Sequence, residues 1–151
     1  MVPEQIERET VIAAPVERVW ALLTEAEHLG RWFGDAGAEL DLRPGGALSL
    51  SWEQHGTVRG RVVDVEAPRR FSYRWAALPE PDGGEPVEGN STLVEFTLEA
   101  EGEGTRLRVV ESGFDKLFVD AAEQDERAEG NRTGWGIELA DLADYAARVA
   151  V

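Results

Sequence analysis

The two histidines are the first candidates for acid–base chemistry in this sequence, because an imidazole titrates near neutral pH. His28 comes just before a pair of large aromatic residues, where it is either a base facing a pocket or a histidine at a helix end. His55 lies in a Gln-His-Gly stretch that is typical of a solvated turn. The sequence has no cysteine, and two isolated histidines do not have the spacing of zinc ligands. We therefore predict no metal site, no cofactor and no catalytic nucleophile–base pair.

Glu111 differs from the other acidic residues in its spacing. It continues the alternation of Leu107 and Val109, which would direct its carboxylate to the face that those side chains share. A buried carboxylate is costly unless it is hydrogen-bonded, and such a group can bind a polar part of a substrate or exchange a proton with it. The alternative is a carboxylate at a strand end, turned to solvent beside Ser112 and Gly113.

The stretch RWF between Gly30 and Gly34 places Trp32 and Phe33 side by side. Because glycines bracket it, we expect this stretch to be irregular. Two large rings outside any regular pattern either fill the core or line a cavity, and both roles remain open for this pair.

Composition excludes several classes of partner. The chain has 30 acidic and 15 basic residues, which gives a net charge of −15. Nucleic acids and anionic membrane surfaces bind clustered cations, so neither is an expected partner, and no protein partner is indicated. The N-terminal MVPEQIERETVIAA lacks the features of a signal peptide, and the apolar run VWALL is too short to span a bilayer. We expect a cytoplasmic protein with one domain over residues 1–151.

The N-terminal part predicts one strand followed by two short helices. Residues 5–13 become rich in β-branched side chains, as in a strand. Pro15 suits the first position of a helix. The helical stripe that follows it is formed by Val16, Val19, Trp20 and Leu23. Thr24 and Glu27 have the spacing of a capping box, which predicts the start of a second helix.

From residue 36 the apolar period becomes two, which predicts antiparallel strands with one buried face. The segments with this pattern are GALSLSWE, TVRGRVVDVE, FSYRW, TLVEFTLE and RLRVVES. The stretch LPEPDGGEPVEGN, residues 78–90, combines proline, glycine and acidic residues, and we predict a mobile hairpin loop there.

The tail NRTGWGIELADLADYAARVA returns to a helical period. Its apolar stripe consists of Trp135, Leu139, Leu142, Ala146 and Val149, and its polar side includes Glu138, Asp141, Asp144 and Arg148. These elements predict an α+β domain, in which a curved antiparallel sheet of six to seven strands wraps around a long C-terminal helix. The two short helices after the first strand would close one end of the space between sheet and helix.

The order and spacing of these segments resemble a known family. The residues that carry the resemblance are AAPVERVWALLTEAEHLGRWFG, RPGGALSLSW, GRVVDVEAPRRFSYRW, STLVEFTLEAEGEGTRLRVVESGF and GWGIELADLADYA. The chain resembles the START-like (Bet v 1-like, SRPBCC) superfamily and, within it, the activator of heat-shock-protein-90 ATPase homologue family. The resemblance implies a helix-grip fold, in a superfamily of lipid carriers, hormone receptors, polyketide cyclases and co-chaperone domains.

From the architecture and the resemblance we predict a binding domain for an apolar or amphipathic small molecule, with an internal cavity. The predicted ligand-binding residues are Trp32, Phe33, Leu50, Trp52, Phe71, Tyr73, Trp75, Phe96, Glu111, Trp135 and Leu139. One alternative is a cyclase or hydratase that uses Glu111, His28 or Tyr73. The other alternative is a co-chaperone-like interaction domain. We call the region between the curved sheet and the C-terminal helix the grip. A polar cluster inside the grip would favour the enzyme, and a contiguous exposed apolar patch would favour the interaction domain.

Overall fold

The computed structural model describes residues 2–54, 56–76 and 85–148. The elements, in chain order, are β1 (Gln5–Ile12), α1 (Val16–Thr24), α2 (Ala26–Trp32), β2 (Ala38–Leu40), β3 (Ala47–Trp52), β4 (Gly56–Glu66), β5 (Arg70–Ala76), β6 (Ser91–Glu101), β7 (Gly104–Ser112), the 3-10 helix η1 (Phe114–Lys116) and α3 (Ala121–Arg148). Among these residues, no helix is both long and apolar enough to cross a membrane.

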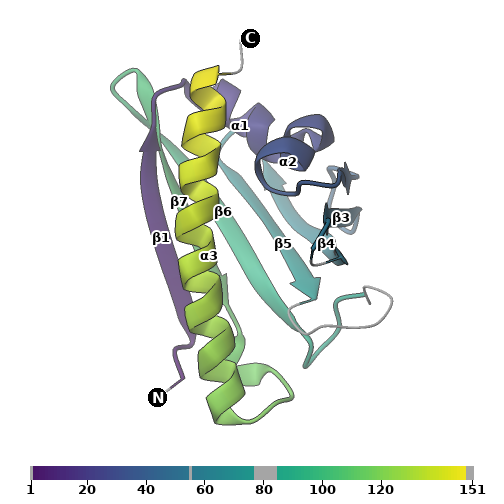
Figure 1. Cartoon of the computed structure of the whole chain (residues 1–151). Helices are drawn as coiled ribbons and strands as arrows, with labels where there is room; N and C mark the ends of the chain where they lie inside the picture. Colours follow the sequence, from purple (N-terminus) through teal and green to yellow (C-terminus); the bar gives the residue numbers. More distant parts are fainter. Residues whose placement is uncertain (1, 55, 77–84, 149–151) are drawn as a thin grey trace.

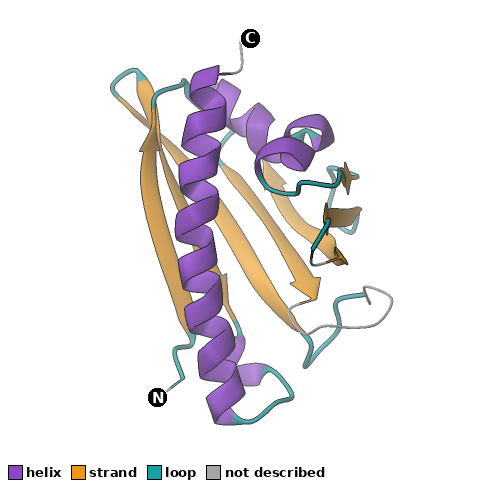
Figure 2. Ribbon diagram, viewed as in Figure 1, coloured by secondary structure: helices purple, strands orange, loops and turns teal. Residues whose placement is uncertain are grey.

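The strands form one antiparallel sheet in the order β1-β7-β6-β5-β4-β3-β2. Every strand after β1 lies next to its neighbour in sequence, and β1 returns to pair with β7 along its whole length. All the helices lie on one face of this sheet, with α3 running along it and α1 and α2 beside the C-terminal half of α3 (Figures 1 and 2). The α+β helix-grip fold is therefore confirmed.

The period of two decides which side chains face the helices. On β5, Phe71 and Tyr73 are buried towards α3, and Arg74 is exposed on the other face. On β6 and β7, the inward set is Val94, Phe96, Leu98, Leu107 and Val109, and all of these side chains are buried. The outward arginines pair with acids on the neighbouring strand, as Arg108 does with Glu7 at 2.7 Å. The sheet thus has one apolar inner face and one charged outer face.

Helix α3 begins ten residues earlier than the tail pattern predicted, at Ala121 rather than near residue 131. The Asp120 carboxylate accepts the backbone N–H of Glu123 at 2.9 Å, which is an N-terminal cap. Its first ten residues bury only Ala128, so they carry no apolar stripe that a sequence pattern could reveal. From Trp135 onward the predicted stripe faces the sheet, except that Val149 lies outside the described residues.

Two local predictions near α2 are wrong. The Thr24 hydroxyl donates to the carbonyl of Trp20 at 2.7 Å, so it bonds back into α1 and does not cap α2. Glu25 occupies the cap position of α2 without a side-chain bond. The helix then continues through Gly30 to Trp32, where an irregular stretch was expected. The burial of Leu29 and Trp32 on one side explains why this helix continues across a glycine.

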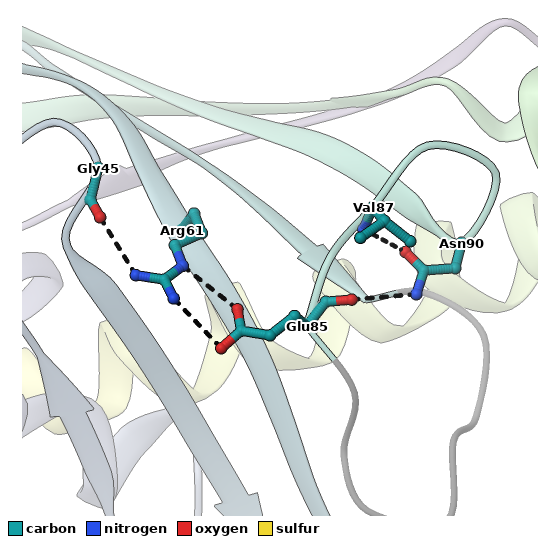
Figure 3. A network of polar contacts seen from close by, with 5 residues as sticks. All are labelled: Gly45, Arg61, Glu85, Val87 and Asn90. Atoms are coloured by element: carbon teal, nitrogen blue, oxygen red, sulfur yellow. Dashed lines mark hydrogen bonds and ion pairs between the residues drawn. The ribbon is translucent and has the colours of Figure 1, made fainter.

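The second half of the predicted mobile loop is fixed by polar contacts (Figure 3). The Arg61 guanidinium on β4 donates to both carboxylate oxygens of Glu85, each at 3.2 Å, and to the carbonyl of Gly45. The Asn90 side chain accepts the N–H of Val87 and donates to the carbonyl of Glu85. The Pro- and Gly-rich residues 78–84 lie outside the described residues, so the mobility of 78–90 stays a prediction.

Candidate functional site

The interior of the grip holds a completely buried carboxylate, that of Glu111 on β7, with 0% exposure. Its Oε1 accepts the indole N–H of Trp135 at 2.8 Å and the amide of Asn131 at 3.0 Å. Its Oε2 accepts the indole N–H of Trp75 at 2.9 Å and the hydroxyl of Thr92 at 2.5 Å. The donors come from β5, β6 and α3, so this one carboxylate connects the helix to the centre of the sheet.

The inward position of Glu111 is therefore confirmed, and the alternative of a solvent-facing strand end is wrong. Strand β7 continues regularly to Ser112, and Glu111 pairs with Ile6 on one side and Val94 on the other. Because both neighbouring strands hold the register, the side chain keeps the inward phase of Leu107 and Val109.

The bonds to Glu111 match an ionised carboxylate. Indole and amide N–H groups can only donate, and the Thr92 hydroxyl donates to Oε2 while it accepts from Trp75 at 3.1 Å. Each carboxylate oxygen thus meets donors and needs no proton of its own. Across residues 2–54, 56–76 and 85–148, no ion pair includes this carboxylate, so its negative charge is balanced by N–H and O–H dipoles alone.

Tyr73 presents the opposite situation, because its buried hydroxyl has no partner in the part of the chain that the structure describes. The side chain is 2% exposed, and Oη has no hydrogen-bond partner among the described residues. Burial, together with the charges of Glu111 and Glu138, raises the pKa of the Tyr73 phenol well above its usual value. Tyr73 is therefore a neutral hydroxyl inside the grip, near two carboxylates and free to donate or accept.

Glu138 on α3 is the site residue that the sequence analysis missed. Its Oε2 is buried and has no partner in the described part of the chain. Burial, followed by the charges of Asp141 and Asp35, raises the pKa of Glu138 to about 7. The tail pattern placed Glu138 on the polar side of the helix. Its spacing of three residues from Trp135 and four from Leu142 is the signal that puts it at the edge of the buried stripe.

Phe33 is at the centre of the aromatic cluster. Its ring lies 5.1 Å from Trp32, 5.4 Å from Trp52, 5.7 Å from Trp75 and 5.2 Å from Trp135, measured between centroids. These contacts join the end of α2 to β3, β5 and α3. The cluster therefore closes the interior of the grip on the side of α2.

Trp32 and Phe33 are both buried, with exposures of 4% and 6%. The indole N–H of Trp32 donates to the carbonyl of Leu22 at 2.7 Å, so this ring is fastened to α1. The Trp52 indole donates in turn to the carbonyl of Phe33 at 2.9 Å. Core filling thus accounts for Trp32, while Phe33 stands between the core and the partly exposed Trp52.

The predicted ligand-binding residues are brought together in the grip. Trp52 and Trp75 are partly exposed, and all the other predicted residues are buried. The buried set includes Leu50, Phe71 and Phe96 on the inner face of the sheet and Leu139 on α3. Asn131 and Glu138 on α3 are partly exposed as well. The interior therefore meets solvent along a rim, which we define as Trp52, Trp75, Asn131 and Glu138.

His28 does not contact this interior cluster in the described structure. Its Nδ1 is 2.7 Å from the Tyr145 hydroxyl, and the ring lines a pocket of about 370 Å³ with Pro15, Arg18 and Leu22. His55 lies outside the described residues. Four further surface pockets are lined by other residues, and none of the five includes a predicted ligand-binding residue.

Two polar atoms of this arrangement have unused hydrogen-bonding capacity. Tyr73 Oη and Glu138 Oε2 have no partner among the described residues, and a carboxyl group with a pKa near neutrality can act as acid or base. Within the described residues, no group of three or more His, Cys, Asp or Glu side chains is arranged to hold a metal ion.

Solved structures share this architecture. Protein MLL2253 from Mesorhizobium loti is 24% identical, with a TM-score of 0.78 and coverage of 97% of this chain and 99% of that one. CalU16 from Micromonospora echinospora is 24% identical, with a TM-score of 0.70 and coverage of 95% and 76%. DynU16, a protein of the dynemicin biosynthetic locus, is 21% identical, with a TM-score of 0.75 and coverage of 97% and 48%. At these identities the similarity establishes the fold.

A family model gives a more specific match. The model described as "Activator of Hsp90 ATPase homolog 1-like protein" matches residues 13–147, from the end of β1 to the last turn of α3. No protein with a curated description matches the sequence. The matched range includes Glu111, Tyr73, Glu138 and the aromatic cluster.

Proposed function

This chain belongs to the family of activator of Hsp90 ATPase homolog 1-like proteins, and we propose that it binds a small, mainly apolar ligand between the sheet and α3. The observation that carries this proposal is the buried hydroxyl of Tyr73, which has no hydrogen-bond partner among the described residues. Buried polar groups are nearly always hydrogen-bonded, because desolvation without a partner costs about 1–3 kcal/mol. A ligand with one polar group would supply the missing partner.

The surroundings of Tyr73 suit such a ligand. Its ring lies 5.6 Å from Trp75, 5.6 Å from Phe71 and 6.2 Å from Phe96, which is an aromatic wall for an apolar body. Glu138 offers a second free oxygen on the opposite helix. Two polar positions in an aromatic interior orient a ligand, while apolar contact provides most of the affinity.

The rim is the proposed entrance. Trp52 and Trp75 on the sheet and Glu138 on α3 are partly exposed, and Phe33 contacts both indoles. Phe33 is the first residue after α2, and the glycine at position 34 follows it. A ligand that entered here would displace Phe33 from between the indoles, so binding requires the segment after α2 to move.

The proposal is tested with the neutral fluorescent probe N-phenyl-1-naphthylamine. The chain has five tryptophans, so NMR can follow five indole N–H signals during a titration. We expect the signals of Trp52, Trp75 and Trp135 to shift with a saturable dependence. The signal of Trp20, whose ring touches Phe71 at the α1 end, should stay nearly constant. Unchanged signals at all five indoles would contradict the proposal.

Two matched substitutions locate the site. Trp52 and Trp20 are both partly buried, so replacing either with alanine removes a ring of similar exposure. Trp52→Ala should weaken probe binding about tenfold, because it removes one wall of the rim. Trp20→Ala should leave the affinity within about twofold of the wild-type value. Equal losses for both variants would show that a general loosening of the fold, and not the rim, controls probe binding.

The enzyme alternative is favoured by one observation, the polar cluster inside the grip. Glu138 has a pKa of about 7 and Tyr73 is a free hydroxyl, so a proton donor and acceptor are available near neutral pH. The test is to extract any ligand that copurifies, identify it by mass spectrometry and return it to ligand-free protein. A change in mass by the gain or loss of water, abolished in Glu138→Gln, would establish a cyclase or hydratase.

The interaction-domain alternative has less support. The exposed large apolar side chains of the described residues lie on different elements: Val11, Leu42, Val63, Val87, Phe118 and Ile137. Val87 and Phe118 share one groove, which Arg74 and Lys116 also line. Two apolar side chains among charged ones do not form the contiguous patch that a protein-binding surface of this kind needs.

A further inference from the structure

We infer that the ligand of the grip carries a positive charge, as an amine or quaternary ammonium group attached to an apolar body. The inference rests on the proposed function, because it names the ligand class of the same site. It starts from the charge of the groups that surround Tyr73. This side chain is 2% exposed, and its hydroxyl has no partner among the described residues. The charges that act on this residue are those of Glu111 and Glu138.

Acidic groups continue from the interior to the rim. Glu111 on β7 is completely buried, and Glu138 on α3 has one buried carboxylate oxygen without a partner. The charges of Asp35, which follows α2, and Asp141 on α3 act on Glu138 in turn. The charges of Glu111 and Glu138 thus act on Tyr73, and those of Asp35 and Asp141 act on Glu138, so a cation held between Tyr73 and Glu138 would be attracted by these groups.

One ion-paired arginine, Arg127 on α3, lines a surface pocket with Asn131 and pairs with Glu123. Ion-paired arginines of the sheet lie elsewhere. Those of the central strands are on the outer face of the sheet, where Arg106 binds Glu9 and Glu101, and Arg108 binds Glu7. Among the residues that the structure describes, no ion pair involves Glu111, and none involves Glu138. Glu111 is already satisfied by its four donor residues, so the carboxylate that lacks a partner among the described residues is Glu138, and a cationic ligand would provide its counter-charge.

The rings at the rim support the same ligand class. The face of an indole carries negative potential and attracts ammonium groups, most strongly where water is excluded. Trp52 and Trp75 are partly exposed beside Phe33, and the ring of Trp135 lies 5.8 Å from that of Trp75. An anionic ligand would instead meet two carboxylates in a poorly solvated space, so the site should reject fatty-acid-like molecules.

The test compares three molecules with the same ten-carbon chain: decyltrimethylammonium, decan-1-ol and decyl sulfate. Each competes with N-phenyl-1-naphthylamine at one ionic strength, below its micelle concentration. We expect decyltrimethylammonium to bind at least tenfold more tightly than decan-1-ol, and decyl sulfate to bind most weakly. If all three bind equally, the inference fails and the proposed function stands. If none of them, nor the probe, binds, the proposed function fails as well.

A matched pair of double variants separates the site from the general charge of the protein. Asp35→Asn with Glu138→Gln removes the charge of Glu138 at the rim and that of Asp35, which acts on Glu138. Asp64→Asn with Glu99→Gln removes two charges from exposed positions outside it, so both variants have a net charge of −13 (−15 + 2). The preference for the cation should disappear in the first variant and persist in the second. An equal loss in both would show only attraction to an acidic surface and would overturn the inference.

Discussion

Glu111 and Glu138 are carboxylates that both reach the interior of the grip, yet their surroundings differ completely. Glu111 is fully buried and accepts bonds from four donor residues on three elements. Glu138 is only partly buried, and one of its oxygens has no partner in the described part of the chain. A carboxylate whose oxygens are all hydrogen-bonded stabilises the fold. A carboxylate at the rim that has an oxygen without a partner keeps hydrogen-bonding capacity for a ligand.

The comparison shows that burial alone does not identify a binding residue. Glu111 is the more buried of the two, and sequence spacing singled it out as a candidate site residue, but it has little bonding capacity left for a ligand. The carboxylate oxygen that lacks a partner among the described residues belongs to Glu138, at the edge of the helix stripe. Substitutions at these two residues should therefore have opposite effects on stability.

The largest effect is expected for Glu111→Ala. The substitution leaves the indole N–H groups of Trp75 and Trp135, the Asn131 amide and the Thr92 hydroxyl without their acceptor. We expect the free energy of unfolding to fall by about 3–5 kcal/mol, as for removal of one partner from a buried charged network. Urea denaturation followed by tryptophan fluorescence measures this change.

The control is Glu99→Gln, at an exposed position of β6, which should change stability by less than about 0.5 kcal/mol. The loss of stability for Glu111→Gln should lie between those of Glu111→Ala and Glu99→Gln. An amide keeps one acceptor oxygen, but its NH₂ group faces the N–H and O–H donors of the network. A loss below about 1 kcal/mol for Glu111→Ala would mean that the network is not formed in solution and that Glu111 does not stabilise the fold through it.

The second effect concerns pH and Glu138. Its pKa is raised from 4.5 to about 7, so the folded state holds the proton more tightly than the unfolded state does. Its contribution to stability is therefore fully present below about pH 4.5 and is lost as the pH rises through 7. Glu138→Gln should stabilise the protein by about 1 kcal/mol at pH 8, allowing for the partial exposure of this group, and by little at pH 4.5.

The pH series needs a control, because Asp35 and Asp141 also act on Glu138. In Asp141→Asn the pKa of Glu138 should fall, which can be followed by carbon-detected NMR of the side-chain carboxyl. Part of the pH dependence should disappear with it. If Glu138→Gln gave the same stability change at pH 8 and pH 4.5, the effect would come from packing, and the raised pKa would have no support.

Much of the fold could be predicted from the sequence because periodicity decides which side chains are buried. The strands from β3 to β7 alternate regularly, and the inward side chains of FSYRW and TLVEFTLE are those that the period of two predicts. The start of α3 could not be predicted, because Ala121 to Gly130 carry no apolar stripe and the cap is one aspartate.

The site could be predicted less well, because its polar atoms come from elements far apart in the sequence. The partners of Glu111 lie between 19 and 36 residues away in the sequence, on two strands and a helix. No local sequence pattern predicts how these elements pack against one another. The missing partner of Tyr73 cannot be read from spacing at all, since alternation only places its ring on the inner face. The hydrophobic period thus predicts which aromatic rings line the inner face. It does not predict that Tyr73 Oη and Glu138 Oε2 lack partners among the described residues.

The smallest loss of stability, and the clearest effect on binding, is expected for Tyr73→Phe. The two tyrosines of the chain are a matched pair: both are buried, but Tyr145 bonds to His28 at 2.7 Å and Tyr73 Oη has no partner among the described residues. Tyr145→Phe should therefore cost about 1 kcal/mol in unfolding free energy without changing the affinity for decan-1-ol. Tyr73→Phe should not destabilise the ligand-free protein, and should raise its free energy of unfolding by about 1 kcal/mol, because it removes a buried hydroxyl that lacks a partner among the described residues. It should still weaken decan-1-ol binding about three- to tenfold, the value of one hydrogen bond. A loss of stability as large as that of Tyr145→Phe would mean that Tyr73 is bonded within the protein, and its hydroxyl would then not be free for a ligand.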